Sequence, residues 1–380
     1  MAKADSPVEL DQQPGCLHPR ETPVLFGQKD AEDRFLQAWA NERLHQAWLL
    51  RGPPGIGKAT LAYRIARAMI AHGPGPVSNS LFGDVPSVPR SLEGPDNCRV
   101  AQRIRAGAEP CLSVLRLTVN PKTGRPRTQI VVEDVRAAKG FLHLSATDGG
   151  WRVVIVDPVD AMNQSAANAL LKMLEEPPDR VIFLLISQSP GGLLPTIRSR
   201  CRFLDLAPLG KKDLRAALEQ QATTIATNEE TQLSELASGS VGQAMQLLEG
   251  HGLALYGDII GVLTDARVDR KRLLQLAARC SGKSGVDAYR LTTDLLLTLL
   301  GRLARSAATG VTPSPASQAE PGLIGLAARS PADARLWADV TPVVAGRLRH
   351  ALAVNLDPSQ TIIDTFLELD QTLSKIRHAA

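Results

Sequence analysis

A glycine-rich segment near the start of the chain has the composition of a phosphate-binding loop. It reads Gly52-Pro53-Pro54-Gly55-Ile56-Gly57-Lys58-Ala59, and it lies between a short apolar run and a helix-forming stretch. In a P-loop of this kind, glycines let backbone N–H groups surround phosphate oxygens, and a lysine reaches the outer phosphates. The predicted residues that would hold ATP or ADP are Gly52, Gly55, Gly57, Lys58, Ala59, Thr60 and Asp157. The alternative is a plain strand-to-helix turn with a solvated lysine.

Two positions lack the groups that ATP hydrolysis needs. Ala59 stands where a P-loop carries a Ser or Thr that binds magnesium, and Thr60 lies about 100° further round the helix. Asp157 ends an apolar run and is suited to hold the metal, but Pro158 follows it and has no acidic group to activate water. The sequence therefore predicts weak or absent binding of ATP or ADP, and little or no ATPase activity. Asp157 by itself is equally explained as a strand-end cap.

The elements around these residues predict an α/β fold. Four unbroken apolar runs are typical of strands buried on both faces of a parallel sheet, and they span 47–51, 112–119, 152–157 and 181–187. Between the last two, apolar residues at helical spacing predict a helix over about 163–176, which Pro177 ends. This alternation indicates a parallel sheet with helices on both faces, with the P-loop after its first strand.

The strand signal ends after Pro208, and the remaining sequence is helical. We predict three domains: a P-loop nucleotide-binding-type domain over 1–207, a helical lid over 208–253 and an all-α domain over 254–380. The last carries long amphipathic runs and no chemical motif, so we expect it to drive oligomerisation. Segments rich in Gly, Pro and Ser predict a mobile surface insertion over 73–95 and an exposed loop over 306–322.

Composition excludes several classes of protein. The 380 residues are 44% apolar, and 43 basic against 39 acidic side chains leave a net charge of only +4, unlike a bulk nucleic-acid binder. Five scattered cysteines favour free thiols in a reducing cytoplasm over a disulfide framework. No run approaches the ~18 apolar residues of a membrane span, and the first residues lack an apolar signal core. Neither membrane insertion nor export is expected.

Two longer motifs resemble the bacterial clamp-loader family of AAA+ proteins. They are NALLKMLEEPP at 168–178 and LPTIRSRC at 194–201, and the likeness runs from Leu25-Phe26-Gly27-Gln28 faintly into the C-terminal helices. The resemblance implies an AAA+ P-loop sheet flanked by helices, a small helical lid and an all-α C-terminal collar. It also implies a place in the DNA polymerase III holoenzyme, where the loader puts a ring-shaped sliding clamp onto primed DNA.

The resemblance gives Arg200 a catalytic role in trans. In this family the arginine of the Ser-Arg-Cys triplet reaches from one subunit into the ATP site of the next, and here that residue is Arg200. Its permanent charge and planar fork of donors suit the charge that builds on a transferring phosphoryl group. The alternative is that Arg198, Arg200 and Arg202 form a solvated basic edge or contact DNA phosphates.

Departures from the family pattern indicate which kind of subunit this is. ATP-hydrolysing subunits have an intact P-loop, an acidic pair, a cysteine zinc module and a lid arginine. This chain has Ala59, Pro158 and, at the lid position, Gln243. Cys98 and Cys111 are the only cysteines where the zinc module would lie, and two thiolates do not complete a tetrahedral site, so no metal is expected. The resemblance thus implies a supporting subunit whose partners are ATPase subunits, the clamp and primed DNA.

Two other functions stay open from the sequence. One is an ATP-hydrolysing motor subunit of the same family, and the other is a DNA-binding module without nucleotide chemistry. The family's sensor position falls at Ser187 or Ser189, although either serine is explained as well by a polar strand end.

Overall fold

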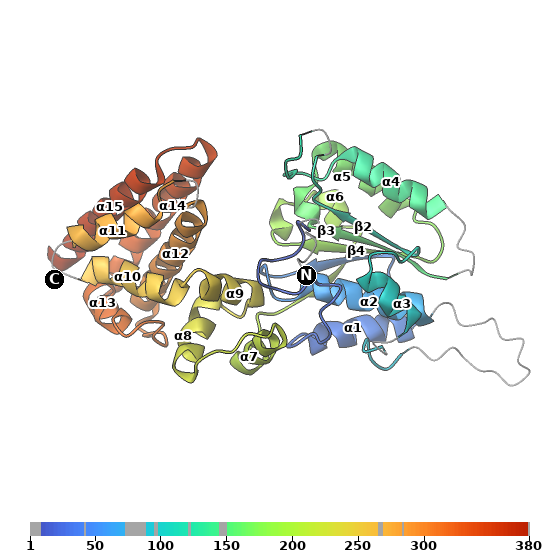
Figure 1. The fold of residues 1–380 in the computed structure, drawn as a ribbon, viewed down its shortest axis with the longest axis horizontal. Helices are drawn as coiled ribbons and strands as arrows, with labels where there is room; N and C mark the ends of the chain where they lie inside the picture. Colours follow the sequence, from blue (N-terminus) through green and yellow to red (C-terminus); the bar gives the residue numbers. More distant parts are fainter. Residues whose placement is uncertain are drawn as a thin grey trace, which may run out of the picture. The chain divides into compact units, whose positions relative to one another are not determined.

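The computed structural model describes residues 9–41, 43–72, 89–94, 98–120, 123–143, 150–264, 269–282 and 285–378 (Figure 1). The chain divides into two compact units. One consists of Met1–Thr223 with Ser240–Gly242, and the other of Thr224–Gly239 with Gln243–Ala380. The three-domain division at 207 and 253 stays a prediction.

The first unit is built around a five-stranded parallel sheet of order β2-β3-β4-β1-β5. Its strands are β1 Ala47–Arg51, β2 Leu112–Arg116, β3 Arg152–Asp157, β4 Val181–Ser187 and β5 Arg202–Asp205. The fold-class prediction is confirmed as an α/β fold: a parallel sheet flanked by helices, followed by a helical C-terminal part. Strand β2 ends earlier than predicted, and the sequence analysis missed the edge strand β5, three of whose four residues are exposed.

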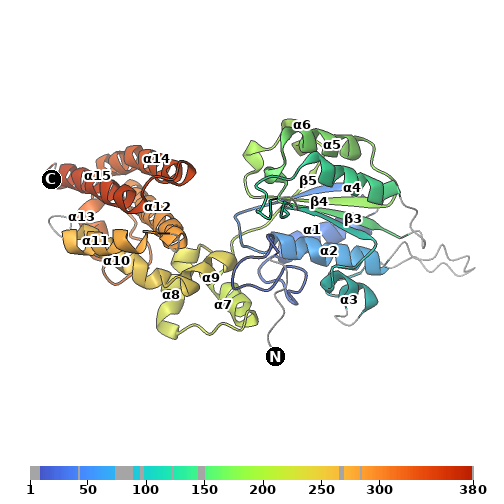
Figure 2. The same ribbon diagram turned by 45° about the horizontal axis from the view of Figure 1, so that its top comes forward.

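Helices cover both faces of the sheet. Figure 2 shows α4 and α5 on one face and α1 and α2 on the other. The helices of this unit are α1 Lys29–Ala40, α2 Lys58–His72, α3 Arg99–Arg105, α4 Val132–His143, α5 Gln164–Glu175, α6 Pro195–Arg198 and α7 Lys211–Gln220. Helix α5 begins where predicted, because the Asn163 side chain accepts a hydrogen bond from the backbone N–H of Ala166 at 2.9 Å.

The strand register places the candidate residues at one edge of the sheet. Leu49 of β1 lies opposite Leu185 of β4, and Val154 of β3 lies opposite Phe183 of the same strand. Because carboxyl ends of parallel strands meet at one edge, the P-loop after β1 lies beside the residues that follow β3 and β4.

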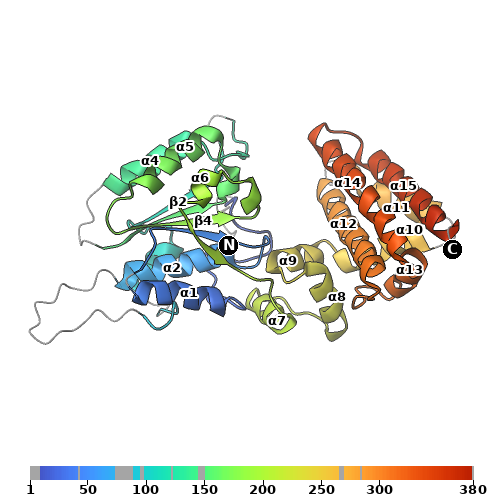
Figure 3. The same cartoon turned by 180° about the vertical axis from the view of Figure 1, so that it is seen from behind.

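The second unit is entirely helical in its described part. It contains α8 Thr227–Ala237, most of α9 Val241–Glu249, α10 Gly252–Thr264, α11 Arg270–Arg279, α12 Gly285–Thr309, α13 Glu320–Ala327, α14 Pro331–Ala353 and α15 Pro358–His378. Helices α12, α14 and α15 run side by side (Figure 3). In the residues that the structure describes, none of these or the other helices combines the length and apolar character needed to cross a membrane.

Two predicted loops are corrected in part. The exposed loop predicted over 306–322 is wrong at both ends, because α12 continues to Thr309 and α13 begins at Glu320. Small residues misled the prediction: Ser306 and Ala307 are buried in the packing of α12. Of the surface insertion predicted over 73–95, residues 73–88 and 95 lie outside the described residues, and Leu92 is fully buried.

A buried ion pair closes the loop between α12 and α13. Glu320 is fully buried, and its carboxylate oxygen Oε1 lies 2.5 Å from Nε of Arg302. Its other oxygen accepts a hydrogen bond from the backbone N–H of Ala316 at 2.6 Å, and the Tyr256 hydroxyl donates to Oε1 at 2.9 Å. One carboxylate therefore joins α10, α12 and the loop before α13.

We expect Glu320→Ala to lower the free energy of unfolding of this helical unit by about 3 kcal/mol, because it leaves Arg302 buried without its main counter-charge. Urea unfolding followed by circular dichroism measures the change. The matched control is Glu249→Ala at the exposed end of α9, which should change stability by less than about 0.5 kcal/mol. Equal effects of the two substitutions would contradict the role given to the buried pair.

Candidate nucleotide-binding site

The P-loop has the tight backbone that its glycines predict. It runs from the end of β1 into α2, with φ of +145° at Gly52, +74° at Gly55 and +100° at Gly57. A Cβ atom at Gly52 would lie 2.7 Å from the carbonyl oxygen of Leu206, and one at Gly57 would lie 2.6 Å from a methyl group of Leu25. Left-handed backbone and close neighbours together restrict these positions to glycine.

Lys58 is folded back onto its own loop. Its ammonium donates hydrogen bonds to the carbonyl oxygens of Gly52 at 2.7 Å and Pro53 at 2.5 Å, and the residue is 5% exposed. Burial lowers the pKa of Lys58 to about 8, against the opposing effect of Asp157 and Asp160. The lysine is therefore charged at pH 7 but already has acceptors in the absence of any phosphate.

The residues discussed as magnesium ligands lie at the start of α2 and at the end of β3. Ala59 lies in the first turn of α2 and presents only a methyl group, while Thr60 is 9% exposed on the buried side of that helix. Asp157 does end β3, and Pro158 follows it. Burial raises the pKa of Asp157 to about 6, with repulsion from Asp11 adding to the shift and attraction to Lys58 opposing it.

Asp160 joins the loop after β3 to the end of β4. Its carboxylate accepts hydrogen bonds from the Ser187 hydroxyl at 2.8 Å and from the backbone N–H of Gln188 at 2.6 Å. Both oxygens are thus used in fixing the loop. Ser187 is fully buried and its hydroxyl points to Asp160. A sensor role for Ser187 or Ser189 stays a prediction.

Gln28 is a site residue that the sequence analysis did not single out. Its amide N–H₂ donates to the carbonyl oxygens of Ile56 at 3.1 Å and Ala207 at 2.7 Å, and its oxygen accepts from the N–H of Ala207 at 3.2 Å. On another side of the loop, the N–H of Val241 donates to the carbonyl oxygen of Gly55 at 2.9 Å. The P-loop is therefore held directly by two segments, at Gln28 and at Val241, and Gln28 also joins it to Ala207. Gln28 falls within the Leu25–Gln28 motif of the sequence analysis, but nothing in that motif indicated these partners.

A second group missed by the sequence analysis lies on the segment that precedes α1. Asp11 accepts two hydrogen bonds from Arg116 at 2.7 and 2.9 Å, and His18 Nε2 lies 3.2 Å from both Asp11 and Glu9. Burial raises the pKa of Asp11, but hydrogen bonds from His18 and Arg116 outweigh it and leave the pKa at about 2. Although Glu9, Asp11 and His18 are close enough to share a cation, Arg116 and Arg20 already compensate the carboxylates. The group therefore fits an anchor for the N-terminal segment better than a metal site.

Arg200 lies at the surface between α6 and β5. Its guanidinium is 2.8 Å from the Glu175 carboxylate at the end of α5, and it donates to the carbonyl oxygen of Thr196 at 3.1 Å. The other two arginines of the predicted edge have different neighbours. Arg198 donates to the carbonyl oxygen of Pro190 at 3.5 Å, and Arg202 stacks over the ring of Trp48. The three side chains therefore do not form one continuous edge.

The cysteines of the predicted zinc region have other contacts. Cys98 caps the start of α3, where its sulfur accepts a hydrogen bond from the N–H of Ala101 at 3.3 Å. Cys111 comes directly before β2. The expectation that the chain binds no zinc stays a prediction.

Comparison with known proteins gives a consistent set of relatives. Residues 27–210 match the family model described as DNA polymerase III, delta subunit. The chain is 36% identical over 209 residues to the DNA polymerase III subunit delta' of Pseudomonas aeruginosa, covering 54% of this chain and 56% of that one. It is 31% identical over 225 residues to the Escherichia coli subunit delta', covering 57% and 59%. The DNA polymerase III subunit gamma of Buchnera aphidicola from Schizaphis graminum is 28% identical over 235 residues, covering 61% and 58%.

The chain thus spans a little over half the length of these curated relatives. Among solved structures, a RuvB variant of Thermotoga maritima is 17% identical with a TM-score of 0.38, covering 83% of this chain and 92% of that one. A gamma-subunit-related protein of the same organism is 16% identical with a TM-score of 0.32, covering 90% and 99%.

The pKa of Lys58 gives a pH-dependent test of the site. The folded pKa of about 8 lies below the ordinary lysine value of 10.5, so the unfolded chain binds more protons between these values and stability rises with pH there. We expect Lys58→Met to raise the free energy of unfolding by up to about 3 kcal/mol at pH 7, and by progressively less as the pH approaches 10. Thermal unfolding at pH 7 and pH 10 measures both values.

The control for this substitution is Lys139→Met, which removes an exposed lysine from α4 of the same unit. It should move the unfolding midpoint little at either pH. A Lys58→Met chain that is less stable than the unaltered one at pH 7, and relatively more stable at pH 10, would contradict the assigned burial cost.

Proposed function

We propose that this chain, whose residues 27–210 match the model of the DNA polymerase III delta-subunit family, is a clamp-loader subunit of the delta-prime kind. In this role it helps to load the sliding clamp onto primed DNA. Its own ATP site does not hydrolyse ATP, and Arg200 completes the site of a neighbouring subunit.

One observation carries this proposal: the P-loop is fully formed but lacks the groups for hydrolysis. Phosphoryl transfer depends on a bound metal and on a positioned water. Ala59 offers no oxygen to magnesium, and Pro158 offers no base to the water. Lys58 already donates its hydrogen bonds to carbonyl oxygens of its own loop, so ATP or ADP binds weakly or not at all, and without turnover. No zinc is needed in this role.

The position of Arg200 supports a role outside its own chain. It lies at the surface, and its guanidinium is paired with Glu175, another partly exposed side chain. A pair of this kind contributes only about 0–1 kcal/mol, so its opening costs little. The guanidinium of Arg200, which is paired with Glu175 in the free chain, can then donate hydrogen bonds to the γ-phosphate of ATP on a neighbouring subunit.

The proposed partners include ATPase subunits of the gamma and tau kind, which are among the relatives. The other proposed partners, the sliding clamp and primed DNA, and the cytoplasmic location rest on the resemblance of the sequence to the clamp-loader family. The helical region over 254–380 would join the chain to its neighbours as a collar. The gamma relatives also support a second candidate, an ATP-hydrolysing motor subunit of the same loader. Turnover by the isolated chain decides between the two.

We expect the purified chain to show little or no magnesium-dependent ATP hydrolysis, with or without primed DNA, because Ala59 and Pro158 replace the groups that the reaction requires. A coupled phosphate-release assay measures this, and Lys58→Ala serves as the background control. Turnover on the order of 1–100 s⁻¹ that Lys58→Ala abolishes would favour the motor subunit instead. Binding of nucleotide without turnover agrees with the proposal.

In a reconstituted loader, Arg200→Ala should lower DNA-stimulated ATPase activity by about 10³-fold or more at the neighbouring site, because an arginine finger contributes on the order of 10³ to 10⁵ in rate. Arg200→Lys should restore little, since lysine keeps the charge but loses the planar fork. Single-turnover hydrolysis by the assembled complex is the measurement.

Two matched variants complete this experiment. Glu175→Gln removes the partner of Arg200 in the free chain, and it should leave the ATPase rate at or above that of the unaltered complex. Arg198→Ala, two residues earlier on α6, should leave it unchanged. The assignment of Arg200 fails if Arg200→Ala complexes hydrolyse ATP normally, or if Arg198→Ala has the same effect.

A further inference from the structure

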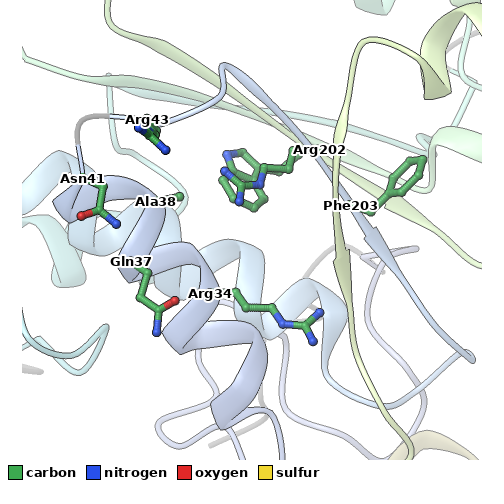
Figure 4. Close-up of a pocket in the computed structure, with 8 residues that line it drawn as sticks. Arg34, Gln37, Ala38, Asn41, Arg43, Arg202 and Phe203 are labelled. Carbon is green, nitrogen blue, oxygen red and sulfur yellow. The ribbon is translucent and has the colours of Figure 1, made fainter.

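A basic pocket lies between α1 and the edge strand β5, away from the nucleotide site. Its volume is about 420 Å³, and the residues that line it are Arg34, Gln37, Ala38, Asn41, Arg43, Trp48, Arg202 and Phe203. Figure 4 shows Arg34, Gln37, Ala38 and Asn41 on α1, with Arg202 and Phe203 on the neighbouring strand. We call this set the α1–β5 pocket.

The charges of the α1–β5 pocket are not compensated. Arg34, Arg43 and Arg202 are all exposed, and within the described residues none forms an ion pair with a carboxylate. Nearby Arg51 differs, because its charge is compensated: two of its guanidinium nitrogens donate hydrogen bonds to the carboxylate of Asp205. Of the residues that the structure describes, no acidic one lines the pocket. Three permanent positive charges therefore face solvent together.

A buried donor points to a missing acceptor at the same place. Trp48 lines the pocket and is only 1% exposed, yet its indole N–H finds no hydrogen-bond partner among the described residues. Buried donors are nearly always paired, and an unpaired one costs about 1–3 kcal/mol. The Arg202 guanidinium lies 5.3 Å from the centre of the Trp48 ring. The two residues lie opposite each other on the paired strands β1 and β5.

The spacing of the polar groups fits a ligand with repeated negative charges. Arg34, Gln37, Ala38 and Asn41 recur at i, i+3, i+4 and i+7, so they form one stripe about 10 Å long on α1. Arg43 follows the helix, and Arg202 lies on β5, which has no further strand beyond it. Donors therefore occur along the length of the pocket and on both of its sides.

We propose that the α1–β5 pocket binds the phosphate backbone of DNA. Apart from Phe203, which is 41% exposed, no large exposed apolar side chain lines it, so it lacks the apolar centre of a protein interface. Interfaces with nucleic acids are instead polar and strongly positive. The choice of DNA as the polyanion rests on the proposed function.

This pocket is distinct from the Arg200 site. Arg200 is held by Glu175, whereas Arg202 turns to Trp48 across the sheet edge. The two arginines therefore have separate tasks: Arg202 contacts DNA phosphates and Arg200 contacts a neighbour's nucleotide.

The test is DNA binding by the full chain carrying Arg34→Gln and Arg43→Gln together. Fluorescence anisotropy with a labelled oligothymidylate longer than about 16 nucleotides is measured between about 50 and 200 mM salt. We expect about tenfold weaker binding and a salt slope smaller by about 1.4, since each lost phosphate contact removes about 0.7 for a single strand. A matched DNA duplex should be weakened in the same way.

The control removes two exposed arginines elsewhere, Arg305→Gln and Arg335→Gln, so the change in net charge is the same. Trp48→Phe keeps an aromatic ring but deletes the unpaired donor, and it should weaken binding while the chain stays folded. The proposal is overturned if the two double variants bind DNA with the same affinity. It is also overturned if polyglutamate of equal charge competes with the labelled DNA as strongly as unlabelled DNA does. Arg200→Ala should bind DNA like the unaltered chain, so failure here leaves the proposed function intact.

Discussion

The register between β1 and β4 sets the position of every group in the candidate site. Pairing Leu49 with Leu185 brings the turn after β1 beside the residues that follow β3 and β4. Because three strand ends meet there, few side chains are needed to complete a phosphate-binding surface, and their identities decide the chemistry. The same arrangement supports hydrolysis when a hydroxyl and an acid are present. Here Ala59 and Pro158 occupy the positions of that hydroxyl and that acid, and on this difference rests the proposal that the site does not hydrolyse ATP.

Burial dominates the electrostatics of the candidate site. Lys58 and Asp157 are both buried. Burial lowers the pKa of Lys58 and raises the pKa of Asp157, which favours the neutral form of each side chain. Neither group gains full compensation, since Asp11 repels Asp157 while Lys58 donates its hydrogen bonds to its own loop. Burying these two groups therefore lowers the stability of the fold.

Much of the fold could be predicted from the sequence because its central strands are continuous apolar runs. Strands β1, β3 and β4 and helix α5 have this kind of local signal, and so does the P-loop. Strand β5 does not, because an edge strand with exposed Arg202 and Phe203 resembles a loop. The roles of Gln28 and Asp11 depend on partners far away in the sequence, so no local pattern could reveal them.

The Gln28 amide couples two segments of the first unit through a single side chain. One end of it holds the P-loop at Ile56, and both ends hold Ala207, which leads out of the sheet toward α7. Along the peptide chain, most of the sheet lies between Ile56 and Ala207. Through the Gln28 side chain, the shortest connection between the two residues consists of only two hydrogen bonds. A displacement of the P-loop would therefore be transmitted through the hydrogen bonds of Gln28 to the segment that leads to α7, while the strands stay in place.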